Sequence, residues 1–200
     1  MARRGEMNRF RSLTLATVSA LLLALTPAIP AGLDPGERVR AAPEMRLKAA
    51  ILFNFAKYVE WPASSFTGPT APLTFGILGD DPFGNEFDAV IAGRAIHGRA
   101  VAVKRGRSLR DLTDCHVLYL SISEKERFAS ILLAVNGRPI LTVGESSGFL
   151  LQGGMIRLFV DESRVRFEVN LEASNRGGLK LSSQMLQLAS SIRNGQGKEE

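Results

Sequence analysis

A serine between glycines is the clearest catalytic motif in the sequence. Residues 144–148 read GESSG and match G-x-S-x-G, directly after an apolar run at 140–143. A nucleophile elbow needs a helix after the serine and a histidine later in the chain to accept its proton. The only histidines, His97 and His116, both precede Ser146, and a strand-like run follows it. We therefore expect a polar turn between strands rather than a serine hydrolase.

The two histidines do not form a metal site by spacing either. His97 and His116 lie in different predicted strands, and no Glu or Cys stands at ligand spacing from either. The basic segment that separates them carries no Walker-type glycine loop and no G-x-G-x-x-G, so the sequence does not indicate a nucleotide-hydrolysing site. We expect no metal and no other cofactor.

Two adjacent acids, Asp80 and Asp81, follow an apolar run at 73–78. Paired carboxylates at the end of a strand suit acid/base chemistry or hard-metal binding. In the string GDDPFG at 79–84, a short acidic side chain can instead accept backbone N–H groups, shaping the turn and capping the next helix. We favour the turn and cap, and a binding role stays open.

Six basic residues cluster shortly after this turn: Arg94, Arg99, Lys104, Arg105, Arg107 and Arg110. Guanidinium groups suit carboxylate and phosphate, although such a run is commonly a solvated face. A small anionic ligand held between these residues and the two aspartates gives the alternative function, a periplasmic ligand sensor.

The elements that position these residues follow from apolar periodicity. Short apolar runs predict strands, and helical spacing predicts helices, in the order strand 73–78, helix 85–92, strand 96–103, strand 116–120, helix 124–135 and strand 140–143. Such mixing of strands and helices favours a partly parallel sheet with helices against its faces.

Two further helices and a hairpin are predicted before and after these elements. A first helix, between Pro43 and Pro62, is predicted to bury one stripe: Leu47, Ile51, Phe55 and Tyr58. Runs at 155–160 and 164–169 predict a hairpin with one wet face. A last amphipathic helix is expected to bury Leu181, Met185, Leu188 and Ile192, ahead of a polar tail at 194–200. The predicted fold is α/β: a single-domain mixed β-sheet flanked by helices, an α/β sandwich with a C-terminal hairpin and helix.

The N-terminal segment has the layout of a secretory signal peptide. Four arginines precede an apolar run at 13–25, and prolines and alanines follow at 27–31. The run is shorter than the roughly 20 residues that span a bilayer as a helix. We predict a cleavable signal at 1–31, cut between 28 and 41, and a periplasmic protein. Its removal takes away four Arg and one Glu and lowers the formal net charge from +5 to +2, which argues against nucleic-acid binding.

Several ordered strings are more specific than this periodicity. They are KAAILFNFAKYVEWP at 48–62, GDDPFG at 79–84, CHVLY at 115–119, GF at 148–149 followed by GGMI at 153–156, VRFEVNL at 165–171 and GLKLSSQ at 178–184. Together they resemble the YfiR family of periplasmic proteins, over a domain that we place at 45–193. The resemblance implies an α/β sandwich without chemistry of its own. It also implies repression of a membrane-bound diguanylate cyclase of the YfiN type, by binding its periplasmic sensory portion, which lowers cyclic di-GMP and biofilm formation. A homodimer stays open, since no stretch specifies it.

The candidate contact residues lie in family-like strings at the ends of elements, where loops on a rigid scaffold commonly carry recognition. They are Trp61, Asp80, Asp81, Phe83, Asn170 and Lys180. For Trp61 and Phe83 the alternative is core packing, because large aromatic side chains dominate cores as well as interfaces.

One departure from the family concerns the only cysteine, Cys115. The resemblance implies a disulfide from this position to a cysteine in the strand before the GDDPFG string, where this chain has Thr74, Phe75 and Gly76. We expect Cys115 to be a small buried apolar residue, with an intermolecular disulfide as the alternative.

Overall fold

A computed structural model describes residues 35–195, with side chains from residue 43 onward. The predicted signal peptide and residues 196–200 of the predicted tail lie outside the described residues. The helices are α1 (Pro35–Phe55), η1 (Ala63–Ser65), α2 (Asn85–Ile91), η2 (Leu109–Leu112), η3 (Ile122–Arg127), α3 (Phe128–Ala134), α4 (Leu171–Arg176) and α5 (Ser183–Leu188). The strands are β1 (Val59–Glu60), β2 (Leu73–Leu78), β3 (Ala95–Ile96), β4 (Arg99–Gly106), β5 (Val117–Leu120), β6 (Leu141–Gly144), β7 (Ile156–Asp161), β8 (Arg164–Asn170), β9 (Lys180–Leu181) and β10 (Ser191–Arg193).

Eight strands form one mixed sheet in the order β10-β8-β7-β6-β5-β2-β4-β3. The central strands β4, β2, β5, β6 and β7 run parallel, and the β3–β4 and β7–β8 hairpins supply the antiparallel pairs. A separate two-stranded ladder joins β1 to β9. The predicted α/β fold with a mixed sheet, helices and a hairpin is confirmed.

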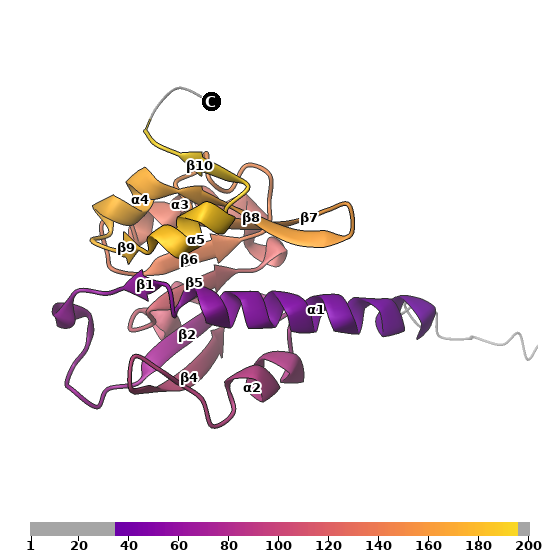
Figure 1. The fold of residues 1–200 in the computed structure, drawn as a ribbon, viewed down its shortest axis with the longest axis horizontal. Coiled ribbons are helices and arrows are strands. Elements are labelled where there is room, and N and C mark those ends of the chain that lie inside the picture. Colours follow the sequence, from indigo (N-terminus) through magenta and orange to yellow (C-terminus); the bar gives the residue numbers. More distant parts are fainter. Residues whose placement is uncertain (1–34, 196–200) are drawn as a thin grey trace, which may run out of the picture. The chain divides into compact units, whose positions relative to one another are not determined.

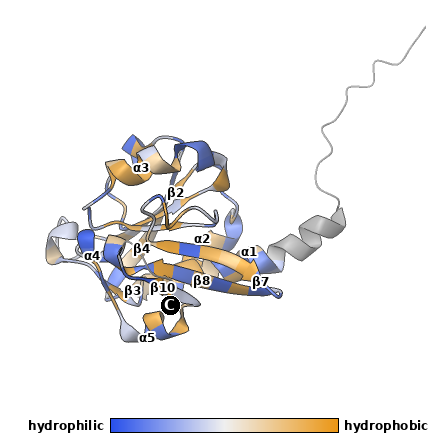
Figure 2. Cartoon of the chain, turned by 90° about the horizontal axis from the view of Figure 1, so that it is seen from above, coloured by the Kyte–Doolittle hydropathy of each residue, from blue (hydrophilic) through white to orange (hydrophobic). Residues whose placement is uncertain are grey.

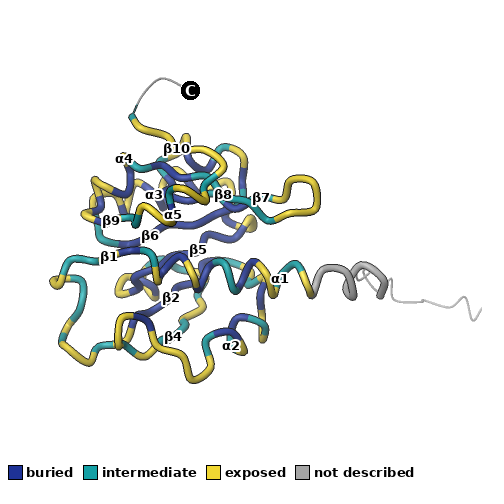
Figure 3. Tube along the Cα trace, in the orientation of Figure 1, coloured by how far each residue is buried: buried dark blue, intermediate teal, exposed yellow. Residues whose placement is uncertain are grey.

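Both faces of the parallel strands are covered, which explains why β2 and β5 are buried along their whole length. On one face, Phe75 and Ile77 of β2 pack with the buried residues of α1 and α2. On the other face, Leu78 of β2 packs with Phe128 of α3 and with Phe149. Figure 2 shows α3 and α5 on opposite sides of the strands, and Figure 3 shows the buried strands in the centre and the exposed tip of the β7–β8 hairpin.

The parallel strands define two edges of the sheet. We call the edge at which β2 and β5 begin (Leu73, Val117) the amino edge, and the edge at which they end (Leu78, Leu120) the carboxyl edge. The β7–β8 hairpin points its tip beyond the carboxyl edge, and Figure 1 shows the β1–β9 ladder at the opposite end of the sheet.

The predicted start of the first helix after Pro43 is wrong, and its predicted buried stripe is confirmed only in part. The helix already begins at Pro35 and contains Pro43. Its fully buried side chains are Ala49, Leu52, Phe53 and Ala56, whereas Leu47 is 49% exposed. Of the predicted stripe, Phe55 is buried and meets Phe167 of β8 edge to ring at 5.0 Å, and Ile51 and Tyr58 are partly buried against the same core. The helix therefore buries a wider apolar surface than the one predicted stripe.

The predicted last helix is also wrong in extent. Leu181 belongs to β9 and Ile192 to β10, and α5 covers only Ser183–Leu188. Of the four predicted core residues only Met185 is buried, and Leu188 is 68% exposed. Pairing of β10 with β8 extends the sheet and takes the chain out of the helical conformation.

Candidate functional site

The G-x-S-x-G segment is the predicted turn. A run of turns, without a helix, connects β6 to β7, and the carbonyl of Ser146 accepts a hydrogen bond from the backbone N–H of Phe149 at 3.0 Å. A Cβ atom at Gly144 would lie 2.6 Å from the ring of Phe149, so this glycine admits an aromatic ring to the core. The motif is explained by packing.

Asp81 holds the turn at the carboxyl edge, as predicted. One carboxylate oxygen accepts the backbone N–H of Phe83 at 2.8 Å, and the other accepts from Arg105 at 2.6 Å. The predicted capping of α2 by these acids is wrong, because Gly84 occupies the N-cap position without a side-chain hydrogen bond. Asp80 pairs with Arg107 at 2.7 Å.

Much of the basic cluster is paired with carboxylates of the same chain. Arg105 also contacts Asp88 at 2.9 Å, and Lys104 contacts Asp114 at 2.6 Å. Burial alone would lower the pKa of Arg105, but its hydrogen bonds to Asp81 and Asp88 raise it on balance. A small anion that approached this region would compete with carboxylates already in place.

A buried polar network lies nearby, and sequence reasoning missed it. Lys48 of α1, 5% exposed, contacts Glu145 at 2.7 Å and Glu44 at 2.8 Å, and Glu145 also accepts from the hydroxyl of Tyr119 at 2.7 Å. Burial would lower the pKa of Lys48, but its hydrogen bonds to the two glutamates raise it on balance. Burial and the charge of Glu145 raise the pKa of Tyr119. The network fixes α1 to the carboxyl ends of β5 and β6.

Phe83 is a core residue of the carboxyl edge. It is 3% exposed, and its ring meets Tyr119 at 4.8 Å and Phe87 at 5.9 Å between centroids. The packing alternative therefore describes this side chain, and it offers no surface for a contact in this conformation.

Trp61 and His116 meet at the amino edge. The indole Nε1–H donates to the backbone carbonyl of His116 at 3.3 Å, and the two rings lie edge to face at 6.3 Å. Trp61 is half-buried. The ring of His116 is buried and stacks on Phe66 at 4.3 Å. Burial lowers the pKa of His116, which is the largest effect on it.

Lys180 lies opposite Glu60, the residue before Trp61, in the β1–β9 ladder. Lys180 is exposed, and no ion pair is found for it among the residues that the structure describes. Asn170, in contrast, is buried; its side chain caps α4 by accepting the N–H of Ala173 at 3.0 Å and donates to Leu150 at 3.2 Å. This residue has a structural role.

The six candidate residues do not form one site. Trp61 and Lys180 lie at the amino edge. Asn170 lies between the two edges, because β8 ends beside Met155, level with the middle of β5. The other three, Asp80, Asp81 and Phe83, follow the last residue of β2 at the carboxyl edge. The six residues of β2 put about 17 Å between the edges.

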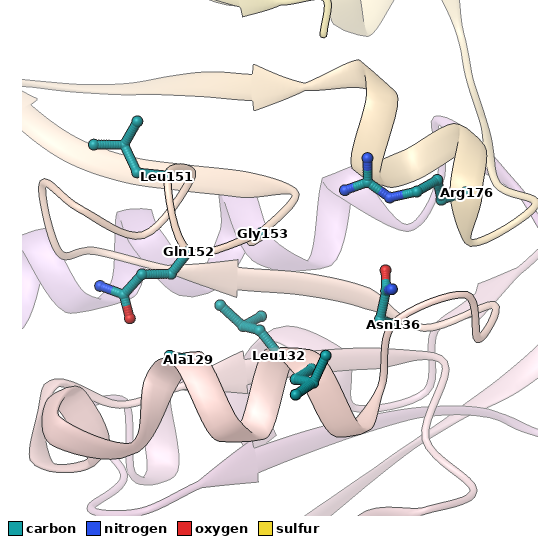
Figure 4. A pocket seen from close by; sticks show the side chains of 8 residues that line it. Ala129, Leu132, Asn136, Leu151, Gln152, Gly153 and Arg176 are labelled. Carbon is teal, nitrogen blue, oxygen red and sulfur yellow. The ribbon is translucent and has the colours of Figure 1, made fainter. Parts of the chain in front are cut away.

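A cavity of about 360 Å³ lies between α3, the turn after β6 and α4 (Figure 4). Its rim carries two leucines that are largely exposed, Leu133 at 75% and Leu151 at 70%. Its one charged lining residue, Arg176, pairs with Glu172 at 2.6 Å. Among residues 43–195, no group of three or more His, Cys, Asp or Glu side chains is placed to hold a metal ion.

A family model described as YfiR/HmsC-like matches residues 45–190. The chain belongs to the YfiR/HmsC-like family. This confirms the resemblance drawn from the sequence strings. YfiR-like proteins are regulators of diguanylate cyclases at the level of the family and generally not enzymes.

Two solved structures have a similar fold to this YfiR/HmsC-like chain. One is the ABC domain in complex with L-Trp from Streptococcus pneumonia, with 11% identity and a TM-score of 0.52 over 72% of this chain. The other is a conserved domain protein from Vibrio cholerae, with 11% identity and a TM-score of 0.51 over 74% of this chain. The chain spans 60% of the length of each. At this identity the likeness concerns the fold alone.

The departure from the YfiR-like cysteine pattern has a clear geometry. Cys115 is free and buried, as expected, and burial raises the pKa of its thiol to about 12. A Cβ atom built on Gly76 would lie 3.2 Å from the Cβ and 3.1 Å from the Sγ of Cys115. Gly76 therefore lies directly against Cys115, and it is one of the three positions at which the resemblance implies a second cysteine.

Proposed function

We propose that this YfiR/HmsC-like protein is exported to the periplasm and represses a membrane-bound diguanylate cyclase of the YfiN type by binding its periplasmic sensory portion. Repression lowers cyclic di-GMP and biofilm formation, and release of the partner raises both. The family match over residues 45–190 carries the proposal. The signal-peptide pattern of residues 1–31 supports export. In the part of the chain that the structure describes, no helix is long and apolar enough to cross a membrane.

The proposed contact surface is the amino edge around Trp61 and Lys180. Trp61 is partly buried in a loop and packs against the core, which leaves part of its ring at the surface, and Trp is enriched among residues that dominate binding energy. Lys180 is exposed and is paired across the β1–β9 ladder with Glu60, the residue before Trp61. The pair suits a partner surface that offers an apolar pocket beside a carboxylate.

The carboxyl edge supports this assignment by contrast. Asp80 and Asp81 are paired with Arg107 and Arg105, so a partner that bound them would have to break existing ion pairs. Phe83 is buried beneath the same turn. Equivalent charge substitutions at the two edges can therefore test which edge contacts the partner.

The test compares intracellular cyclic di-GMP in the native host with the intact gene, with a deletion, and with a version that lacks residues 1–31. We expect cyclic di-GMP to rise on deletion and to fall again only with the exported form. Unchanged levels in all three strains would contradict the proposal. Rescue by the version without residues 1–31 would place the activity outside the periplasm.

A further inference from the structure

The loop 61–72 connects β1 to β2 and lies against the amino edge of the sheet. Two side chains from the sheet hold it. Arg99 of β4 donates from Nη1 to the carbonyls of Gly68 at 2.9 Å and Ala71 at 2.8 Å, and its guanidinium lies 3.7 Å from the ring centroid of Phe66. His116 provides the second attachment.

Both ring nitrogens of His116 are engaged. The backbone N–H of Thr74 points at Nδ1 at 3.1 Å, and Nε2 lies 3.1 Å from the carbonyl oxygen of Ser65 in the loop. An N–H group is a donor only, so Nδ1 must be without a proton, and the proton of the neutral ring is on Nε2, where it donates to Ser65. One tautomer of the neutral ring satisfies both contacts.

The protonated ring does not fit this arrangement. It carries an N–H on each nitrogen, so the N–H on Nδ1 would face the N–H of Thr74 at 3.1 Å. Phe66 stacks on His116 and has the guanidinium of Arg99 on it as well, so protonation brings a second cation to this cluster.

Charged groups around the ring come from two elements. Arg99 of β4 disfavours the protonated ring, and Asp114, in the turn before β5, favours it. Lys104 of β4 pairs with Asp114 at 2.6 Å and offsets its charge. The loop contributes the aromatic rings of Trp61 and Phe66, and β2 contributes only the backbone of Thr74.

We propose that His116 is an acid-sensitive clasp: protonation of its ring releases residues 61–66 of the loop, Trp61 among them, from the amino edge, while Arg99 keeps its contacts with Gly68 and Ala71 and the sheet stays folded. The direction follows from linkage. Burial lowers the pKa of His116 below the ordinary value of 6.5, so the released form binds more protons than the clasped form. The clasp is complete above pH 6.5 and is lost as the pH falls through the lower value of the folded protein.

The chain offers a direct probe, because Trp61 is its only tryptophan and it donates to the backbone of His116. The experiment records Trp61 emission of the purified protein between about pH 7.5 and about pH 5, with far-UV circular dichroism at each step. We expect a reversible red shift with a midpoint below 6.5 and an unchanged dichroism spectrum. A dichroism change with the same midpoint would overturn the proposal, because acid would then unfold the whole domain.

Two variants assign the transition, since the chain has two histidines. His116→Asn keeps an oxygen acceptor for the Thr74 N–H at every pH, so we expect the emission shift to disappear. His97→Gln changes the other histidine, whose Nε2 lies 3.2 Å from the carbonyl oxygen of Val59; glutamine keeps an N–H donor for this contact, so the shift should stay intact. A shift that persists in His116→Asn, or that is lost in His97→Gln, would refute the role of His116.

Amide exchange in the wild type gives a second readout that requires no variant. The N–H of Thr74 loses its acceptor on release, so its protection factor should fall more than tenfold on acidification, while amides within β5 stay protected. Equal loss at both places would contradict a local clasp. The clasp itself does not depend on the proposed function. A weakening of partner binding in acid rests on the proposed function as well as on the clasp. The fluorescence test uses the isolated chain, so the clasp and the proposed function can fail separately.

Discussion

The two edges of the parallel strands are held by different chemistry. At the carboxyl edge, ion pairs of Arg105 and Arg107 with aspartates fix the turn at 79–84. At the amino edge, the loop 61–72 is fixed by a neutral imidazole and by a guanidinium that contacts carbonyl oxygens. At the carboxyl edge these charged side chains are therefore paired with one another. The amino edge leaves an aromatic side chain and a lysine at the surface. It also depends on a histidine whose pKa is lowered by burial from its ordinary value of 6.5, which suits a regulated contact.

The largest effect is expected from the aromatic residue of the carboxyl edge. Phe83→Ala removes a buried ring from between Tyr119 and Phe87 and should lower the free energy of unfolding by about 3–5 kcal/mol. Trp61→Ala at the amino edge removes a half-exposed ring and should cost about 1–2 kcal/mol. Urea denaturation of both variants checks the order. Equal losses would mean that Trp61 is a core residue like Phe83.

A covalent link tests the geometry next to the amino edge. Gly76→Cys should form a disulfide with Cys115 under oxidising conditions and stabilise the chain by up to about 4 kcal/mol relative to its reduced form. The measurement is the thermal midpoint with and without reductant. Gly76→Ser is the matched control, because it adds an atom of similar size without a bond, and we expect it to be destabilised with or without reductant. No shift on oxidation of Gly76→Cys would show that the two positions do not meet.

Lys48 tests how far the carboxyl edge depends on its buried charge. Lys48→Met leaves Glu145 with the Tyr119 hydroxyl as its partner and should cost about 2 kcal/mol, less than for a fully buried pair because the Glu145 side chain is 26% exposed. The double variant Lys48→Met with Glu145→Gln should recover part of the loss. Denaturant unfolding of the single and double variants measures the coupling, and strictly additive losses would contradict it.

The smallest effect is expected from the exposed ion pair. Arg107→Ala should change the free energy of unfolding by less than about 0.5 kcal/mol, because the side chains of Arg107 and Asp80 are 81% and 64% exposed. The same denaturation experiment checks it. A loss as large as that of Lys48→Met would mean that the surface pairs hold the carboxyl edge together.

The sequence predicted the sheet far better than the helices at its ends. Runs such as 73–78 have one conformation that buries every side chain, so their strands could be placed without tertiary information. In the first helix the predicted stripe identified the buried Phe55, but it included the exposed Leu47 and left out Leu52 and Phe53, because how much of the helix is covered depends on tertiary contacts. The last helix failed because strand pairing with β8 overrides its helical spacing.

The candidate residues were predicted as types and positions but not as a site. The sequence placed Asp81 in a turn, because an Asx turn depends on residues two apart. It could not show that Arg105 would neutralise Asp81, since the two residues are 24 positions apart in the sequence and meet only in the fold. Lys48 was missed because lysines are seldom buried and its partner Glu145 lies 97 residues away in the sequence. The roles of His116 require segments that only the fold brings together.

The most direct test of the amino-edge account uses two matched charge reversals in a host that lacks the gene. Lys180→Glu lies at the amino edge, and Lys125→Glu lies in η3 after the carboxyl end of β5; both lysines are exposed. Intracellular cyclic di-GMP is measured with each variant expressed in exported form at equal level. The account predicts that Lys125→Glu restores low cyclic di-GMP like the wild type, whereas Lys180→Glu leaves it high. Full repression by Lys180→Glu together with loss of repression by Lys125→Glu would contradict the account and move the contact to the carboxyl edge.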